Sequence, residues 1–283
     1  DVRVEGDRVV VPLRLSPGAD VRSRGEDLAA GDAVIPAGVV LAPHEAGVVA
    51  AAGHDAAWCV GRVRVALLVA GDELAPPGGD LREGEVFDAN RYAIEAQARA
   101  AGAALADAAT VGDDPARVRA EVERLLEGDG ARPEMLVTAG GVSSGPHDHL
   151  RAALRSAGVE EVVPHVRMRP GHPTWLGVRG DQVVLALPGN PVAASVCFHA
   201  FGRPLLGHTD AWEERAPLVV PVRNRPGRAL LLRCRATSAG LVPMERQGSA
   251  AISSMAGAHA LAWVPADVAR LPAGSPVRIA RLR

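Results

Sequence analysis

Between residues 62 and 208 the chain alternates apolar strand patterns with helix patterns, and this alternation limits its possible folds more than any other feature. The strand patterns are "RVRVALLVA", "ALADAATV", "EMLVTA", "EEVVPHVRM" and "TWLGVRGDQVVLAL". The helix patterns are "DANRYAIEAQARAAGA", "DDPARVRAEVERLLEG", "DHLRAALRSAG" and "PVAASVCFHAFGRPLL". Such alternation is typical of a mostly parallel sheet with helices on both faces, and strands that are apolar throughout agree with burial on both sides. We therefore expect residues 62–208 to form a three-layer α/β domain.

The segments that flank this domain have other patterns. Residues 1–31 hold short β-branched runs separated by turns and are interpreted as the tail of a β-rich domain. Residues 32–61 are expected to be a helical linker segment, with Pro43 in the first turn of its helix and Gly53 at the end. Residues 209–283 show short strands between turns and predict a small all-β domain. The chain starts on a strand-like pattern without Met, so we expect further residues upstream.

Composition excludes several classes of protein. The chain has 283 residues, is 48% hydrophobic and carries a formal net charge of -2, so it can bury a core and has no bias toward nucleic acid. No apolar run reaches the ~18 residues of a membrane span, so no membrane partner is expected. Cys59, Cys197 and Cys234 lie far apart without metal-ligand spacing. Cys197 falls in an apolar helix pattern and is predicted to be a buried thiol, and a reducing cytoplasm is the expected location.

Three loops are expected at one edge of the sheet, because the carboxyl ends of parallel strands meet there and ligands bind beyond them. These loops are "AGDEL", "AGGVSSG" and "LPGNP". Gly140 and Gly141 allow a ligand close to the backbone, and Ser143 and Ser144 add hydroxyl donors before a helix N-terminus. This combination favours a phosphate or another oxyanion.

The last of these loops and one further loop also supply binding groups. In "LPGNP", Pro188 stiffens the loop, Gly189 permits close approach and Asn190 both donates and accepts hydrogen bonds. In "RPGHP", Arg169 offers a planar cation, and His172 binds an anion when it is protonated.

Acidic residues are expected at the same edge. They are Glu73, Asp113, Asp114 and Asp148. Carboxylates that face a phosphate need a cation between them, and oxygen ligands favour Mg²⁺. Each acid also has a structural interpretation: Asp148 and one of the pair before Pro115 fit helix N-caps, and Glu73 fits a solvated loop.

Known nucleotide and hydrolase motifs are absent from the sequence. It contains no GxxxxGK[ST], no GxGxxG and no GxSxG. A P-loop NTPase, a dinucleotide oxidoreductase and an α/β-hydrolase are therefore disfavoured.

Eight motifs in one order resemble the molybdopterin molybdenumtransferase family, which includes the catalytic half of gephyrin-type proteins. They are "RSRGED", "AGDEL", "FDANRYAIEAQARAAGA", "VGDDP", "TAGGVSSGPHD", "RPGHP", "LPGNPVAASVCF" and "RQGSAAISSMAGAHAL". The resemblance implies insertion of molybdate into adenylylated molybdopterin, assisted by Mg²⁺, with release of AMP. It also implies a cytoplasmic homodimer whose partner subunit completes each cleft, and contacts with molybdopterin adenylyltransferase and apo-molybdoenzymes.

The resemblance also implies roles for individual residues. Asp148 and Glu73 match acids that would hold Mg²⁺ or position molybdate and the leaving phosphoanhydride. Asp113 or Asp114 matches the family's acid pair before Pro, and Asp27 matches the acid of its Arg-Gly-Glu-Asp turn. The expected substrate-binding residues are Asp27, Asn90, Gly140, Gly141, Ser143, Ser144, Arg169, His172, Pro188, Gly189 and Asn190.

The chain departs from the family pattern at two places. Arg169 and His172 stand where family members carry lysines, and Pro146 and His147 replace a flexible acidic stretch before Asp148. These departures keep open a pterin- or nucleotide-binding homologue without turnover. A molybdopterin adenylyltransferase is a further alternative, although the "LPGNP" loop and the C-terminal β domain speak against it.

Overall fold

The computed structural model describes residues 3–11, 16–128, 130–142, 149–208 and 212–282. The chain forms two compact units, Asp1–Gly61 and Arg62–Arg283. Among the described residues, no helix is both long and apolar enough to cross a membrane.

The smaller unit contains a hairpin and one helix. Strands β1 (Arg3–Glu5) and β2 (Arg8–Val10) pair antiparallel, and α1 spans Pro43–Ala51. Pro43 occupies the first turn of α1, and the helix ends just before Gly53, which has φ +85°. The described side chains of this unit contribute nothing to the buried hydrophobic core.

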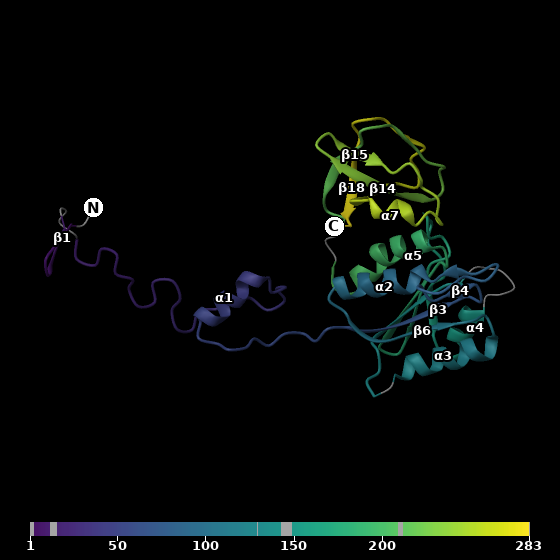
Figure 1. Ribbon diagram of the computed structural model, residues 1–283, viewed down its shortest axis with the longest axis horizontal. Coiled ribbons are helices and arrows are strands. Elements are labelled where there is room, and N and C mark those ends of the chain that lie inside the picture. Colours follow the sequence, from purple (N-terminus) through teal and green to yellow (C-terminus); the bar gives the residue numbers. More distant parts are fainter. Residues whose placement is uncertain (1–2, 12–15, 129, 143–148, 209–211, 283) are drawn as a thin grey trace. The chain divides into compact units, whose positions relative to one another are not determined.

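A six-stranded sheet forms the centre of the larger unit (Figure 1). Its strands, in spatial order, are β6 (Ala104–Val111), β3 (Arg64–Ala70), β7 (Met135–Ala139), β11 (Gln182–Leu187), β10 (Trp175–Arg179) and β8 (Glu160–Val163). The first four strands are parallel, and β10 runs antiparallel to both of its neighbours. The reversal follows from a two-residue turn at Gly180 and Asp181, where Gly180 has φ +60°. The prediction of a mostly parallel sheet is confirmed.

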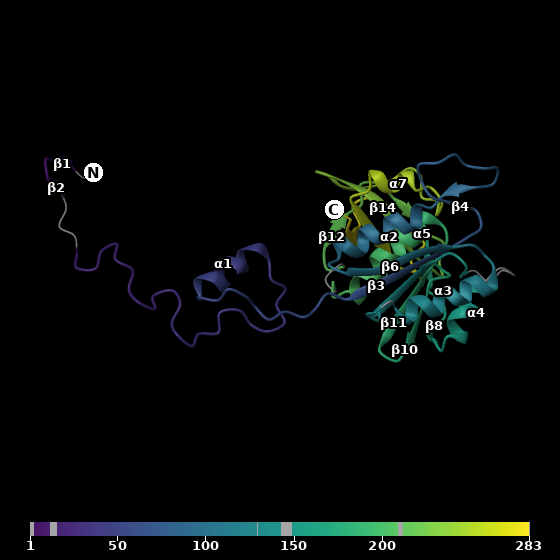
Figure 2. The same ribbon diagram turned by 60° about the horizontal axis from the view of Figure 1, so that its bottom comes forward.

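Helices cover both faces of this sheet, as Figures 1 and 2 show. On one face lie α2 (Ala89–Ala100) and α5 (Pro191–Cys197), which continues into a π-helix, η1 (Phe198–Gly202), and a short α6 (Arg203–Leu205). On the other face lie α3 (Pro115–Glu127) and α4 (His149–Ser156). Strand β3 divides its side chains between two cores: Val65, Leu67 and Val69 in one, and Ala66, Leu68 and Ala70 in the other. Two-sided burial explains why this strand is apolar throughout.

Side-chain caps fix where two of these helices begin. The Asp88 carboxylate accepts from the Arg91 backbone N–H at 3.0 Å and starts α2. The Asp114 carboxylate accepts from the Arg117 N–H at 2.8 Å and starts α3. Because each helix begins at the carboxyl edge of the sheet, these caps set the geometry of that edge.

An antiparallel β domain follows the α/β domain. Its main sheet has the order β12 (Arg215–Pro217), β18 (Pro276–Arg281), β16 (Ala260–Val264), β14 (Ala229–Thr237) and β15 (Gly240–Pro243). Its smaller elements are β13 (Val222–Arg223), which pairs with β17 (Arg270–Leu271), and α7 (Ser253–Ala256). In the α/β domain, between β3 and α2, the short strands β4 (Leu74–Ala75) and β5 (Val86–Phe87) pair parallel. Strand β9 (Met168–Arg169) leaves the α/β domain to pair with β14. Leu231 and Leu261 pack in the same core cluster as Phe198, so the two domains share a hydrophobic core.

Candidate functional site

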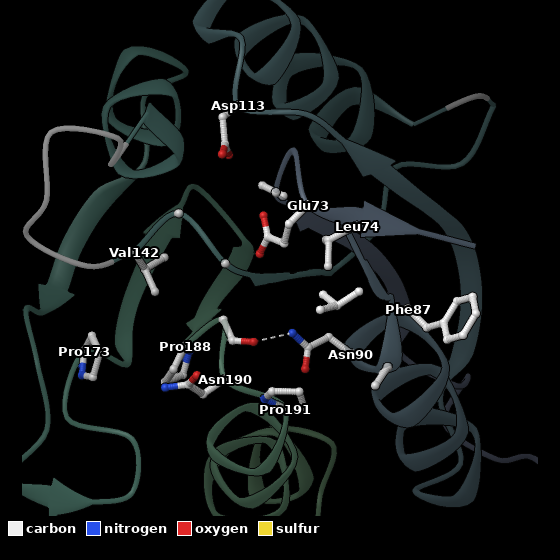
Figure 3. A pocket seen from close by; sticks show the side chains of 17 residues that line it. Glu73, Leu74, Phe87, Asn90, Asp113, Val142, Pro173, Pro188, Asn190 and Pro191 are labelled. Carbon is white, nitrogen blue, oxygen red and sulfur yellow. Dashed lines mark hydrogen bonds between the residues drawn. The ribbon is translucent and has the colours of Figure 1, made fainter. Parts of the chain in front are cut away.

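The order of the parallel strands creates a crevice at one edge of the sheet. In the sheet, β3 lies between β6 and β7. The chain runs from β3 to β6 on one side and from β7 to β8 on the other side, so these two connections leave in opposite directions. Ligands of open α/β sheets bind at such a switch point, beyond the carboxyl ends of the strands. A pocket of about 580 Å³ lies there and is lined by residues that follow β3, β6, β7 and β11 (Figure 3). The expectation that these loops share one edge is therefore confirmed for their described residues.

Acidic side chains come from the loops after β3 and β6. Glu73 and Asp113 both line the pocket, and Figure 3 shows their carboxylates in the same part of it. Asp72, which the sequence analysis did not single out, joins the two loops. Its carboxylate accepts from the Asp113 N–H at 2.8 Å, and the Asp113 carboxylate accepts from the Asp72 N–H at 3.4 Å. The two loops that carry the acids are thus held together by a reciprocal pair of hydrogen bonds.

In the other half of the pocket, the loops after β7 and β11 contribute glycines, whose backbone is not covered by a side chain. Gly140 has φ +89°, and a Cβ there would overlap the carbonyl oxygen of Ala70 at the end of β3. A Cβ on Gly189 would lie 3.4 Å from the Gly140 Cα. The Gly140 N–H donates to the Leu187 carbonyl at 3.3 Å, so this amide is engaged within the protein and is not free for an anion. Close packing of three strand ends explains the glycine at this position.

Two asparagines lie at the starts of the helices on this edge. Asn90 is only 5% exposed and donates through Nδ2 to the Gly189 carbonyl at 2.7 Å, as drawn in Figure 3. Its Oδ1 is buried and has no partner among the described residues. Asn190 donates to the Ser249 hydroxyl at 3.2 Å, and the Val192 N–H donates to the Ser249 carbonyl at 3.1 Å. A residue of the C-terminal β domain is therefore bonded to a loop that lines the pocket.

The remaining predicted residues lie in several places. Glu73, Asn90, Asp113, Gly140, Gly141, Pro188, Gly189 and Asn190 line the pocket. Ser143, Ser144 and Asp148 fall outside the described residues. Asp114 caps α3 and is not among the lining residues, and Asp27 lies in an exposed turn of the N-terminal unit. The roles proposed for all of these residues stay predictions.

The "RPGHP" loop reaches the pocket through Pro173, whereas Arg169 and His172 are not among the described lining residues. Arg169 is exposed on β9. His172 Nδ1 lies 2.8 Å from the Val166 carbonyl oxygen, which only accepts, so Nδ1 carries the proton and Nε2 is an acceptor in the neutral ring. His165 packs edge-on against it, with ring centroids 5.1 Å apart. Beneath this loop the Cys197 thiol is buried, and burial raises its pKa to about 12, so the prediction of a buried thiol is confirmed.

The structure adds a buried cation that sequence reasoning missed. Arg233 on β14 is fully buried and donates through Nη2 to the carbonyls of Arg246, at 2.9 Å, and Gly248, at 3.2 Å. Its Nε and Nη1 have no partner among the described residues, and burial lowers the pKa of the guanidinium. The bonded segment leads directly into Ser249. The sequence did contain an indication of this buried cation, because Arg233 is a charged residue inside the apolar strand pattern "ALLLRC".

Comparisons with known proteins agree on one family. Residues 66–208 match the family described as a probable molybdopterin binding domain, and residues 215–282 match the MoeA C-terminal region (domain IV). Molybdopterin molybdenumtransferase 2 of Mycobacterium tuberculosis (strain H37Rv) is 32% identical over 296 residues, which cover 96% of this chain and 70% of the relative. Molybdopterin molybdenumtransferase of Synechococcus elongatus is 31% identical over 290 residues, covering 100% of this chain and 71% of the relative.

A solved structure supports the fold. The molybdopterin biosynthesis moea protein from Pyrococcus horikosii superposes with a TM-score of 0.79 at 23% identity, covering 100% of this chain and 70% of that one. Its likeness extends over the α/β domain and the antiparallel β domain together. The expected fold class, an α/β domain with a C-terminal all-β domain, is thereby confirmed.

Proposed function

Because the chain belongs to the molybdopterin molybdenumtransferase family, we propose that it inserts molybdate into adenylylated molybdopterin, with release of AMP, as a step of molybdenum cofactor biosynthesis. The observation that carries this proposal is the pocket at the switch point of the sheet, which combines two carboxylates with close-packed glycine loops. A pocket of about 580 Å³ lies within the range of about 300–1,000 Å³ that is usual for small-molecule sites.

In this proposal the glycine half of the pocket binds the substrate's phosphoanhydride, and the acidic half binds a metal ion. The phosphoanhydride of the substrate lies along Gly140 and Gly189, which line the pocket without a side chain. The Asn90 amide donates to the Gly189 carbonyl and so holds in place the loop against which this ligand lies. The hydroxyls of Ser143 and Ser144 belong to this group by resemblance to the family.

Mg²⁺ fits the donor set of the acidic half. Glu73 and Asp113 offer oxygen ligands, and Mg²⁺ is typically bound by one or two carboxylates together with substrate phosphates. No group of three or more His, Cys, Asp or Glu side chains forms a metal cluster among the described residues. We propose that Glu73 and Asp113 hold the ion, together with Asp148. When bound, the ion would neutralise charge on the phosphoanhydride.

The test is molybdate-dependent release of AMP from adenylylated molybdopterin. Glu73→Gln keeps the shape of the side chain and removes its charge, so we expect turnover to fall by at least tenfold. Glu123→Gln on the exposed face of α3 is the matched control and should leave turnover unchanged. Asp148→Asn should reduce turnover far more than pterin binding. Equal losses of turnover and binding would instead assign Asp148 to capping of α4.

The same assay separates the alternatives. Pterin binding without AMP release would identify a binding homologue, and formation of the adenylylated pterin from ATP would identify an adenylyltransferase. Either outcome would refute the proposed transferase.

We further propose that the protein acts in the cytoplasm as a homodimer whose partner subunit completes the cleft, and that it meets molybdopterin adenylyltransferase and apo-molybdoenzymes. Light scattering of the full-length protein tests the dimer, since a monomeric enzyme with full turnover would contradict it.

A further inference from the structure

A second pocket lies between the α/β domain and the C-terminal β domain. It has a volume of about 270 Å³ and shares no lining residue with the pocket described above. Its polar wall is formed by Gln97 of α2, Ser195 of α5, His199 of η1 and Arg203 of α6. The proposed transferase reaction uses none of these four side chains. A π-helix such as η1 is uncommon and is frequently found at functional sites.

The polar wall offers donors that are already oriented. Gln97 Nε2 donates to Ser195 Oγ at 2.9 Å, which leaves the hydroxyl hydrogen of the buried Ser195 free to donate to another group. His199 is 3% exposed, and its pKa is lowered to about 4 by burial and then by the charge of Arg203. The ring is therefore neutral at pH 7 and stands beside a cation.

Among the residues that the structure describes, Arg203 has no carboxylate within ion-pair distance. Its Nε is buried and has no partner among the described residues. No Asp or Glu is among the described residues that line the pocket. A buried donor without a partner costs about 1–3 kcal/mol, more when it is charged. An anion in the pocket would supply the counter-charge that the described lining residues do not offer to the guanidinium.

The opposite wall is apolar. It consists of Met255, Ala258 and Leu282 from the β domain, with Ala93 and Ala100 of α2 beside them. A fully hydrated inorganic ion would gain nothing from this wall, whereas an alkyl group would be removed from water. The volume lies just below the usual range for drug-sized ligands, so the ligand is small.

We propose that this pocket binds a small organic carboxylate, with its charged end on Arg203, Ser195 and His199 and its alkyl end against Met255 and Leu282. Such a ligand touches both domains at once. The proposal is independent of the reaction proposed above, because the two pockets have no lining residue in common.

Isothermal titration calorimetry with the full chain tests this inference. The probes are 3-methylbutanoate, acetate, inorganic phosphate and the uncharged 3-methylbutanamide. We expect 3-methylbutanoate to bind at least about tenfold more tightly than acetate, since each buried methylene contributes about 0.8 kcal/mol. The amide and phosphate should bind at least about tenfold more weakly than 3-methylbutanoate. Equal affinity for the amide would refute the charge argument, and equal affinity for phosphate would refute the apolar wall.

Two variants locate the binding. Arg203→Gln should abolish the binding of 3-methylbutanoate, and Arg99→Gln, on an exposed position of α2, should leave it unchanged. Unchanged binding by Arg203→Gln would place the ligand elsewhere and overturn the proposal. If that variant does not fold, the His199 ring resonances of the unmodified protein serve instead. They should shift and saturate with 3-methylbutanoate, and a lack of any shift at saturating ligand would overturn the proposal.

Discussion

Replacing Gly140 with alanine tests the central claim that three strand ends pack without room for a side chain. Two separate costs arise in this variant. Gly140 has φ +89°, a conformation that costs a non-glycine residue about 1–2 kcal/mol. A Cβ at this position would also overlap the Ala70 carbonyl oxygen, which is backbone and part of the buried strand β3. The atom it meets cannot rotate away as a flexible side chain would.

Gly158→Ala separates the two costs. Gly158 has φ +83°, close to that of Gly140, but nothing lies within 4 Å of the position of its Cβ. This control therefore carries the backbone cost alone, about 1–2 kcal/mol. Forcing an extra carbon into close-packed surroundings adds typically 1–3 kcal/mol, so Gly140→Ala should lose about 2–5 kcal/mol of unfolding free energy.

Thermal unfolding of both variants measures the difference. For a domain of roughly 150–250 residues, 1 kcal/mol shifts Tm by about 2–4 °C, so the added cost separates the two variants by roughly 2–12 °C. Gly140→Ala should also weaken the binding of adenylylated pterin, because relief of the overlap moves the loop away from β3. Equal Tm values for the two variants would refute the reasoning, since they would mean that the loop has space for a side chain.

Three further predictions follow from other contacts. Asp88→Ala removes the cap of α2 and the acceptor of the Thr110 hydroxyl, so we expect a loss of about 1–3 kcal/mol in denaturant unfolding; a loss below about 0.5 kcal/mol would contradict this. The depressed pKa of His199, about 4, means that the unfolded chain binds a proton before the folded chain does as the pH falls below 6.5. Stability should therefore drop by up to about 3 kcal/mol between pH 6.5 and 4, and His199→Gln should flatten that part of the profile; an unchanged profile would contradict the burial of the ring. Alkylation of the native protein at pH 8 should modify the exposed Cys59 and spare the two buried thiols, whose pKa values are raised to about 12 by burial; mass spectrometry showing a second adduct would contradict this.

Much of the fold was predictable because local patterns and tertiary burial agree. The apolar run at β3 is buried on both faces, so its composition alone indicates its place in the sheet. The glycine-rich loops after β7 and β11 were expected beside each other, and the Gly189–Gly140 contact agrees with that. These inferences succeeded because a small set of rules restricts the strand order and the helix crossovers of α/β folds.

Features that depend on which loops become neighbours were not predictable. Asp72 looks like an ordinary loop acid, and only the parallel pairing of β3 with β6 brings it to Asp113. Asp88 and Asn90 are both of residue types that cap helices, so the local sequence does not decide between them. The structure assigns the cap to Asp88 and buries Asn90 against Gly189. Ser249 lies in a different domain, so no local pattern connects it with Asn190.

The strand order also determines which side of the main pocket carries acidic side chains and which carries glycines. Among the described residues, Glu73 and Asp113 lie on the loops after β3 and β6, on one side of the switch point, and Gly140, Gly141 and Gly189 lie on the loops after β7 and β11, on the other. Glu73 and Asp113 repel an anion, and the Gly140 amide is already bonded to Leu187, so this backbone does not by itself supply the attraction. An anionic substrate therefore needs positive charge from elsewhere. A divalent ion on the acids would supply it at the boundary between the two halves, where the ion and the phosphates can share ligands. Under the proposed function, this arrangement of the described residues is a physical reason for substrate and Mg²⁺ to bind together rather than singly.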